Sequence, residues 1–267
     1  MEFIVSEEEI TAAAAYEDLH VPALFRQWAA PVLDAAQIGP GCRVLDVACG
    51  TGVLAREAAL RLDDDGFVAG LDVNPGMLAV AQQIAPQVAW RQGAAELLPY
   101  GDDSFDVVVS QFGLMFFQDK VGALREMMRV LAPDGRIVIA VWDSLANSEA
   151  YPIEVALLQR LAGQQAADAP RAPFVLGDRA ALAKLFRDAG MESVEITTHS
   201  GTAQFPSIRV MVEADLRGWL PIMGVFLTEA QIEHILQEAE QALSQYLTPE
   251  GTVAFAAPAH IVTGTKL

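Results

Sequence analysis

Basic side chains are scarce in this chain of 267 residues. It has 17 lysines and arginines against 35 aspartates and glutamates, which gives a formal net charge of −18. A protein this acidic repels phosphate backbones and anionic membranes, and no run of Lys or Arg provides a local exception. We therefore expect no nucleic-acid partner.

Cysteine and histidine are also rare, and long apolar runs are missing. The two cysteines, Cys42 and Cys49, form no C-x-x-C pair, and the four histidines have no metal-binding spacing, so we predict no metal site. Reduced thiols are typical of a cytoplasmic protein. Residues 1–10 lack the features of a signal peptide, and no apolar stretch of about 18 residues predicts membrane insertion.

The stretch from Val44 to Gly52 is the most informative part of the sequence. Its apolar residues indicate a strand, Gly50 and Gly52 follow, and a helical pattern begins near Leu54. A strand–turn–helix unit presents free backbone N–H groups at the helix N-terminus, which favour an anionic or hydrogen-bond-accepting ligand. The two glycines leave room for that ligand close to the main chain.

This stretch resembles the first motif of class I S-adenosylmethionine (SAM) dependent methyltransferases, apolar-apolar-Asp-x-x-x-Gly-x-Gly, at every position. Asp72, at the end of the second predicted strand, matches the family's ribose-binding acid. Residues 93–100 resemble its Gly-Asp-Ala-x-x-Leu-Pro-Phe segment beside the adenine, although Ala94 replaces the Asp. The resemblance covers residues 40–142 and is closest to the ubiquinone/menaquinone-biosynthesis-like group of small-molecule methyltransferases.

The resemblance implies SAM as the cofactor, S-adenosylhomocysteine as its product and a small-molecule acceptor. It also implies which residues bind the cofactor, in four segments that follow predicted strands. These residues are Asp46, Ala48, Cys49, Gly50, Thr51, Gly52, Asp72, Val73, Met77, Ala94, Ala95, Glu96, Ser110, Gln111 and Phe112.

The glycine pattern permits another interpretation. It also fits the dinucleotide fingerprint G-x-G-x-x-G/A, with Asp72 about 20 residues further on, so an NAD-dependent oxidoreductase is the alternative. Asp46 favours SAM, because a carboxylate beside the ligand would repel a pyrophosphate but attract the amino group and sulfonium of SAM. A SAM-binding module without catalysis is a third hypothesis.

Strand and helix alternate five times up to residue 142, which predicts an α/β fold with its ligand at the carboxyl ends of the strands. A sixth strand is expected at 193–199 and a final strand region at 253–257 and 259–265. The resemblance implies a doubly wound, mostly parallel seven-stranded sheet, the Rossmann-like methyltransferase fold. In that fold the last strand lies antiparallel between the fifth and sixth.

We expect one methyltransferase domain over residues 1–267. It would comprise an N-terminal helical cap at 1–38, a SAM-binding core at 39–142 and a helical lid insertion at 200–250 between the last two strands. The cap is predicted as a helix over 7–37, broken near Val21 and Pro22, and residues 163–173 as a loop. The insertion is either a lid over the acceptor site or a helical pair that covers the sheet.

The acceptor is less well defined. In the family an N-terminal tyrosine often lies near SAM, and Tyr16 is the candidate here. An oxygen acceptor would need a base, and the candidates form no recognisable dyad, so transfer by proximity alone stays open. The apolar segment 112–117 and the acidic surface favour a small, apolar or neutral-to-cationic acceptor, and a homodimer is also open. The candidate bases are Tyr16, Glu17, His20, His199 and His234.

Overall fold

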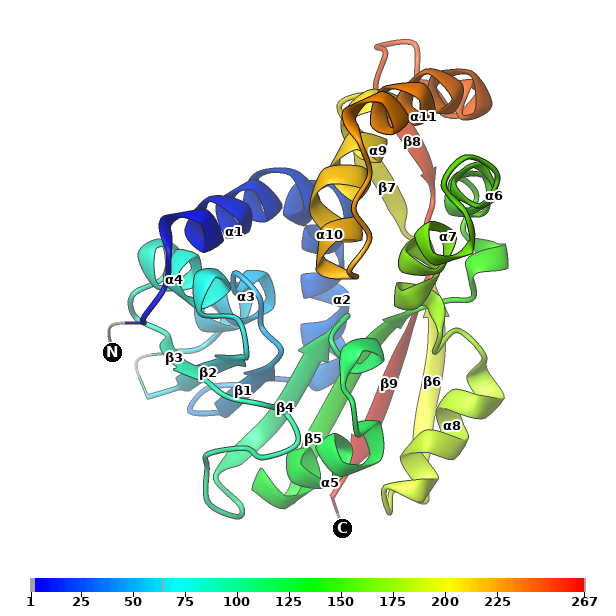
Figure 1. Ribbon diagram of the computed structural model, residues 1–267. Helices are drawn as coiled ribbons and strands as arrows, with labels where there is room; N and C mark the ends of the chain where they lie inside the picture. Colours follow the sequence, from blue (N-terminus) through cyan, green and yellow to red (C-terminus); the bar gives the residue numbers. More distant parts are fainter. Residues whose placement is uncertain (1–2, 64, 267) are drawn as a thin grey trace. The chain divides into compact units, whose positions relative to one another are not determined.

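The computed structural model describes residues 3–63 and 65–266 (Figure 1). These residues form two compact units. Unit 1 comprises Met1–Val141, Asp178–His199 and His260–Leu267, and unit 2 comprises Trp142–Gly177 and Ser200–Ala259. No helix among the described residues is long and apolar enough to cross a membrane.

The N-terminal segment of unit 1 is a helix with a wide turn in its middle. Helix α1 (Glu7–His20) begins with a capping box between Ser6 and Glu9 and leads through the π-helical turn η1 (Val21–Phe25) into α2 (Arg26–Ala36). The sequence predicted a break at Val21 and Pro22. The chain instead widens there, because Pro22 has no N–H for the α-helical hydrogen bond.

The central sheet has seven strands in the order β3-β2-β1-β4-β5-β9-β6, which confirms the predicted fold. The neighbouring strands from β3 to β5 pair in parallel. The strands are β1 (Arg43–Val47), β2 (Phe67–Asp72), β3 (Ala89–Gln92), β4 (Phe105–Gln111), β5 (Leu131–Trp142), β6 (Val194–His199) and β9 (Ala259–Thr265).

Strand β9 runs against its neighbour β5. The N–H of Lys266 donates to the carbonyl of Gly135 near the start of β5, whereas the N–H of Asp143 after the end of β5 donates to Pro258 before β9. Figure 1 shows the same reversal, since β9 runs down to the C-terminal end while β4 and β5 run up. The expected antiparallel last strand is therefore in its predicted place.

Helices cover both faces of the sheet in unit 1. Helix α2 contacts α3 (Val53–Arg61) and lies behind β4 in Figure 1, while α5 (Lys120–Val130) and α8 (Arg179–Asp188) contact each other in front. Helix α4 (Pro75–Ile84) packs on β2 and β3 and carries α1 on its outer side. A short 3-10 turn, η2 (Leu114–Phe116), follows β4. This layering leaves the loops after β1, β2 and β4 at one edge of the sheet.

Unit 2 is mainly helical but contains a small antiparallel sheet. Strand β7 (Thr202–Phe205) pairs with β8 (Val253–Ala256). The other elements of unit 2 are η3 (Leu145–Asn147), α6 (Tyr151–Ala162), α7 (Gln164–Arg171), η4 (Ala172–Phe174), α9 (Ile208–Ala214), η5 (Asp215–Trp219), α10 (Leu220–Ile222), α11 (Glu229–Ala242) and η6 (Ser244–Tyr246).

Two sequence predictions in unit 2 are wrong. Residues 163–173 are not a loop, because Gln164–Arg171 form α7, whose alanines are buried although the segment contains a proline. Residues 253–257 do not join the main sheet, because β8 pairs with β7 and the chain enters β9 only after Pro258. The segment 200–250 also contains a strand, so it is not wholly helical.

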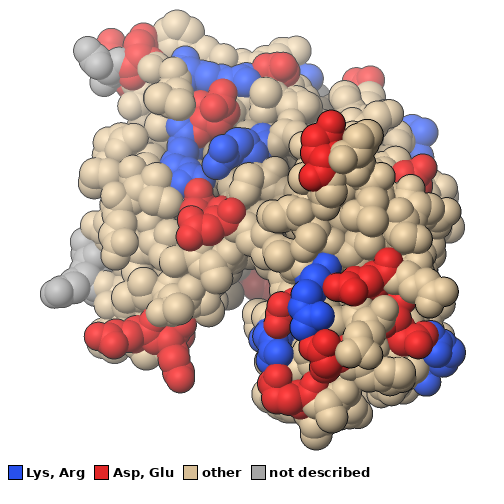
Figure 2. Space-filling model, turned by 90° about the horizontal axis from the view of Figure 1, so that it is seen from above, with Lys and Arg blue, Asp and Glu red and all other residues tan. Residues whose placement is uncertain are grey.

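Many of the scarce basic side chains form ion pairs. Arg61 lies 2.6 Å from Asp34 in unit 1, and Arg217 lies 2.7 Å from Glu229 in unit 2. Figure 2 shows basic atoms beside acidic ones over the face that it presents. Positive charge on that face is therefore interrupted by negative charge.

Candidate functional site

The loop between β1 and α3 has an unusual backbone. Ala48, Gly50 and Gly52 all have positive φ angles, of 58°, 54° and 85°. Only glycine adopts this conformation readily, so Ala48 is strained, and strain of this kind gathers at ligand-binding loops. The N–H of Cys49 donates to the carbonyl of Leu71 at 3.0 Å, which ties the loop to β2.

Asp72 joins this loop to the end of β2. Its Oδ2 accepts a hydrogen bond from the N–H of Gly50 at 2.8 Å, and its Oδ1 accepts one from the N–H of Asn74 at 2.9 Å. Burial raises the pKa of Asp72 above its ordinary value. The sequence predicted a ligand site at the carboxyl ends of the strands, and the structure brings Asp72 and Gly50 into direct contact there. Each carboxylate oxygen still has a lone pair for a further hydroxyl donor.

The space beside Gly50 is open. A Cβ atom built on this residue would meet no other atom within 4 Å. A ligand can therefore approach the backbone of the loop directly here.

Asp46 lies beneath the loop and is more enclosed than its place near the end of β1 suggested. It is 1% exposed, and its Oδ2 accepts the N–H of Ala55 in the first turn of α3 at 3.1 Å. Its Oδ1 has no hydrogen-bond partner among the described residues. Burial raises the pKa of Asp46 well above its ordinary range, and a positive charge nearby would favour its ionised form.

Other buried polar atoms near the strand ends also lack hydrogen-bond partners among the described residues. The hydroxyls of Thr51 and Ser110 and the Oε1 of Gln111 are buried, and none meets a hydrogen-bonding group within the described part of the chain. Buried polar atoms without partners are costly, at about 1–3 kcal/mol each, and each calls for an explanation. A polar ligand in this crevice would supply the missing hydrogen bonds.

The segment after β4 contacts the N-terminal helices. The Nε2 of Gln111 donates to the carbonyl of Phe25 at 3.1 Å, and the ring of Phe112 lies 5.6 Å from that of Phe25 and 5.9 Å from that of Trp28. Phe112 has a positive φ of 57°. A Cβ on the next residue, Gly113, would lie only 2.6 Å from the Cβ of Ala48, so this position must stay small.

The structure brings Tyr16 and His20 towards this site. The ring of Tyr16 stacks on His20 at 5.4 Å and on Phe25 at 5.5 Å. Burial, followed by the negative charges of Asp72 and Glu17, raises the pKa of Tyr16. Burial lowers the pKa of His20, so its imidazole stays neutral at physiological pH and is able to accept a proton.

The other two histidine candidates are exposed. His199 is exposed at the end of β6, and its Nε2 lies 2.9 Å from the hydroxyl of Thr197. Strand β6 stands four positions from β1 in the sheet, or roughly 19 Å at the usual strand spacing. His234 is exposed on α11 in unit 2. His199 therefore does not share the cluster of Tyr16 and His20.

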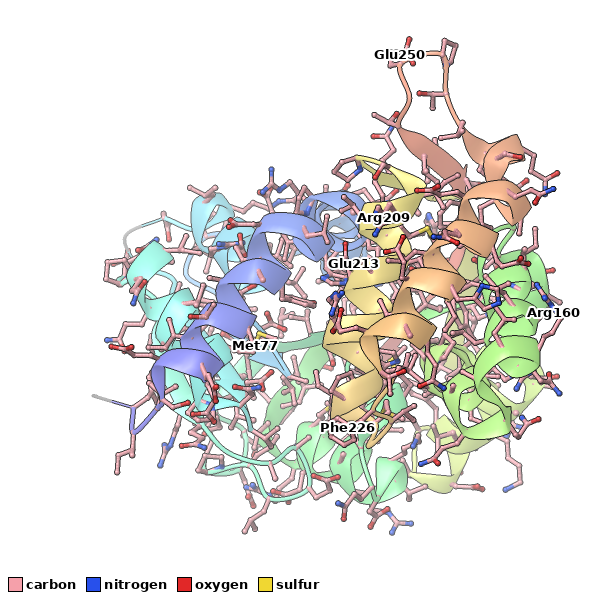
Figure 3. The ribbon with its side chains drawn as sticks, turned by 45° about the horizontal axis from the view of Figure 1, so that its top comes forward. Met77, Arg160, Arg209, Glu213, Phe226 and Glu250 are labelled. Atoms are coloured by element: carbon pink, nitrogen blue, oxygen red, sulfur yellow. The ribbon has the colours of Figure 1, made fainter. Side chains whose placement is uncertain are left out.

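The residues that were predicted to lie beside the adenine differ in their exposure and in their contacts. Val73 is 63% exposed, and its carbonyl accepts a hydrogen bond from Gln92; Met77, labelled in Figure 3, is half-buried on α4. Ala94 is exposed and Ala95 is buried. The Oε1 of Glu96 instead accepts the N–H groups of residues 118 and 119, at 3.0 and 3.4 Å, before α5.

Sequence reasoning missed two contributors to this site. They are Phe25 and the ion pair in which Arg56 lies 2.8 Å from Glu17. The ion pair joins α1 to α3 across 39 positions of sequence, and no sequence motif predicts it. In the described ranges no group of three His, Cys, Asp or Glu side chains is arranged to hold a metal ion.

Comparison with known proteins identifies the family. A family model described as a methyltransferase domain matches residues 45–139. The chain is 34% identical over 196 residues to a ubiquinone/menaquinone biosynthesis C-methyltransferase of Paraburkholderia phymatum, covering 67% of this chain and 79% of that protein. The chain belongs to the class I SAM-dependent methyltransferases. This membership confirms the resemblance found in the sequence and does not favour the NAD-dependent alternative.

Other known proteins match over shorter stretches or share only the fold. The enzyme of the same name from Idiomarina loihiensis is 38% identical over 138 residues, 48% of this chain and 55% of that one. The chain thus spans about half the length of several of the curated relatives it matches. The crystal structure of YcgJ from Bacillus subtilis aligns with a TM-score of 0.60 at 21% identity, covering 90% of this chain and 98% of YcgJ.

Proposed function

We propose that this protein transfers a methyl group from SAM to a small-molecule acceptor. The observation that carries the proposal is the loop after β1, in which Gly50 opens onto free space while the buried Oδ1 of Asp46 and hydroxyl of Thr51 have no partner among the described residues. These atoms and Asp72 fit the cofactor of the family. When bound, SAM supplies a methyl group on a sulfonium, which makes an in-line displacement by the acceptor possible.

The chain's own residues bind and orient the cofactor in this proposal. Asp72 accepts the ribose hydroxyls, and Gly50 leaves room for the methionine moiety. Burial raises the pKa of Asp46, and a cationic ligand near it would lower that pKa again, because opposite charge favours the ionised form. The remaining cofactor contacts predicted from the family, at residues 94–96 and 110–112 among others, stay proposals.

Holding the acceptor close and in line supplies up to roughly 7–11 kcal/mol of the barrier, so a dedicated base is not required. If the acceptor must lose a proton, His20 is the better candidate, since burial keeps it neutral, whereas the raised pKa of Tyr16 keeps its proton in place. The names of the related enzymes make a quinone-like ring the first acceptor class to test. A cytoplasmic location and a homodimer also remain predictions.

Replacing Asp72 by Ala should weaken SAM binding by about 10- to 100-fold, because charged hydrogen bonds of about 1.5–3 kcal/mol are lost. Calorimetric titration with SAM measures the effect. Asp178→Ala is the matched control, since Asp178 also accepts a backbone N–H, from Ala181 at 2.8 Å, but at the start of α8. Equal affinities for SAM in the two variants would remove Asp72 from the site.

The activity itself is tested with SAM that carries a labelled methyl group. Wild-type protein is incubated with a fractionated metabolite extract and, separately, with quinone-like acceptors, and the label is followed. Calorimetry with SAM, S-adenosylhomocysteine and NAD runs alongside. Binding of NAD without binding of SAM would overturn the proposal, and tight SAM binding without labelling of any fraction would indicate a binding module.

A further inference from the structure

Strand β6 has a free edge at the end of the main sheet of unit 1. It is the last strand in the sheet order, with β9 on one side and no strand on the other among the described residues. Figure 1 shows β6 in this outer position. Its residues are half-buried or exposed throughout. An exposed strand edge presents unpaired N–H and carbonyl groups, which are a template for pairing with another chain.

One hydrogen bond shows which backbone groups of β6 point away from β9. The Nη2 of Arg179, at the start of α8, donates to the carbonyl of Ile196 at 2.6 Å. On the side of β9, the hydroxyl of Thr197 donates to the carbonyl of Ile261 at 3.4 Å. Backbone groups of successive residues in a strand alternate between its two edges, so those of Ile196 and Thr198 lie on the free edge.

The residue order of β6 is self-complementary. When two copies of a strand pair antiparallel, a twofold axis at Thr197 places Glu195 of each copy opposite His199 of the other. An axis at Ile196 or Thr198 gives Glu195 an uncharged neighbour, and an axis at Glu195 itself brings two carboxylates together. Of the axes through β6, only the one at Thr197 pairs an acidic side chain with a basic one. Pairs of this kind and threonine pairs stabilise a sheet, whereas like charges destabilise it.

The same axis uses the backbone groups of the free edge. It makes Thr197 a non-hydrogen-bonded pair and joins Ile196 of each copy to Thr198 of the other through their N–H and carbonyl groups. The side chains of Glu195, Thr197 and His199 are exposed and share one face of the strand. The Nε2 of His199 lies 2.9 Å from the Thr197 hydroxyl, which leaves Nδ1 for the carboxylate of the other copy.

We propose that the free edge of β6 is a dimer interface, on which a second copy of this chain pairs antiparallel with its axis at Thr197. The two main sheets then continue into each other. Arg179 caps the carbonyl of Ile196 while the edge is unpaired and releases it on pairing. Each copy has a formal charge of −18, so association is opposed by repulsion and is reversible. The proposal goes beyond methyl transfer and does not depend on SAM.

Thr197→Cys should trap this dimer as a disulfide. Residues opposite each other in a non-hydrogen-bonded pair have Cα atoms about 4.5 Å apart, which is within the range of a disulfide. The full chain is incubated with oxidised glutathione, without SAM, and the linked dimer is followed by gel electrophoresis without reductant. Each bridge reduces one oxidised glutathione to two thiols. Wild type shows any background bridging by Cys42 and Cys49.

Glu195→Cys is the matched control for this trapping. Residue 195 is exposed on the same face as residue 197, but the proposed axis places it opposite His199. Its two copies are therefore roughly 14 Å apart along the strands, beyond the reach of a disulfide. Thr197→Cys should link at least about tenfold faster than Glu195→Cys, whereas random collision would link both variants at similar rates.

The pairing of Glu195 with His199 is tested in the unlinked protein by sedimentation velocity over a range of concentrations. We expect wild type to dimerise reversibly and Glu195→Lys to weaken the dimer by about 2- to 30-fold, since each dimer contains the pair twice. Adding His199→Glu exchanges the charges and should restore the affinity to within about threefold of wild type. Glu192→Lys makes the same change of charge before the strand begins and should not weaken the dimer.

Arg179→Ala removes the guanidinium that competes for the carbonyl of Ile196, and it should tighten the dimer by at least about threefold. Circular dichroism shows that each variant is folded, and the trapping of Thr197→Cys decides alone where a charge variant does not fold. The proposal is overturned if wild type sediments as a single chain at every concentration. It is also overturned if Thr197→Cys links no faster than Glu195→Cys, or if the exchanged variant stays as weak as Glu195→Lys.

Discussion

Gly50→Val should weaken the binding of SAM by at least about 100-fold, or about 2.7 kcal/mol. The side chain would enter the open space beside the loop after β1, where no atom lies within 4 Å of a Cβ on Gly50. The loss would thus come from the volume that the ligand needs and not from a clash inside the protein. Calorimetry with SAM and with S-adenosylhomocysteine measures it.

Gly41→Val is the control variant for the effect of backbone strain. Gly41 has a similar positive φ of 71°, and a Cβ there also meets nothing within 4 Å, but it lies in the turn before β1. Both variants pay a comparable conformational cost, so their stabilities should fall by similar amounts while only Gly50→Val loses SAM. If Gly50→Val bound SAM as well as Gly41→Val does, the cofactor loop would have to lie elsewhere.

Gly70→Val should reduce the free energy of unfolding by about 3 kcal/mol, at the upper end of what overpacking costs. Gly70 lies in β2, where a Cβ would stand 2.3 Å from a ring carbon of Trp90 and 3.1 Å from the sulfur of Cys49. Trp90 cannot easily move, since its Nε1–H donates to the carbonyl of Ala85 at 2.9 Å and the side chain is 8% exposed. Denaturant unfolding of the variant against wild type measures the loss.

A double-mutant cycle identifies the cause. Trp90→Leu frees the space, so the double variant should be more stable than the sum of the single losses by about 1–2 kcal/mol. Gly101→Val is the matched control, because a Cβ on Gly101 meets only the hydroxyl of Ser104, at an ordinary 3.5 Å. Strict additivity of Gly70→Val and Trp90→Leu would show that the ring is not what excludes a side chain from Gly70.

The alternation of strands and helices up to residue 142 was predictable because each element has its own local pattern. Val107, Val108 and Val109 form a buried run in β4, and Asn74 caps α4 as its type suggests. Pro258 indicated an interruption between the two segments of the last strand region, and the structure confirms it. The pairing partner of β8 was not predictable from the sequence. A strand pairs with a neighbouring strand whose edge is free, and here that strand is β7.

Helix α7 is a second element that the sequence did not predict. Its sequence is Ala-rich and contains a proline, and local reasoning assigned it to a loop. In the structure Ala166, Ala167 and Ala169 are buried, and the carbonyl of Ala169 accepts a hydrogen bond from the indole of Trp219 in η5. Packing within unit 2 thus stabilises a helix although it contains a proline.

The sequence by itself determined the family, the fold and the loop of Gly50 and Gly52. A ligand-binding turn is built from consecutive residues, so the positions at which its backbone requires glycine can be read directly from the sequence. Only the tertiary structure decided which distant side chains meet. It stacked the ring of Tyr16 on those of His20 and Phe25 but left His199 on a far strand. Packing of whole elements, not local spacing, produces such placements.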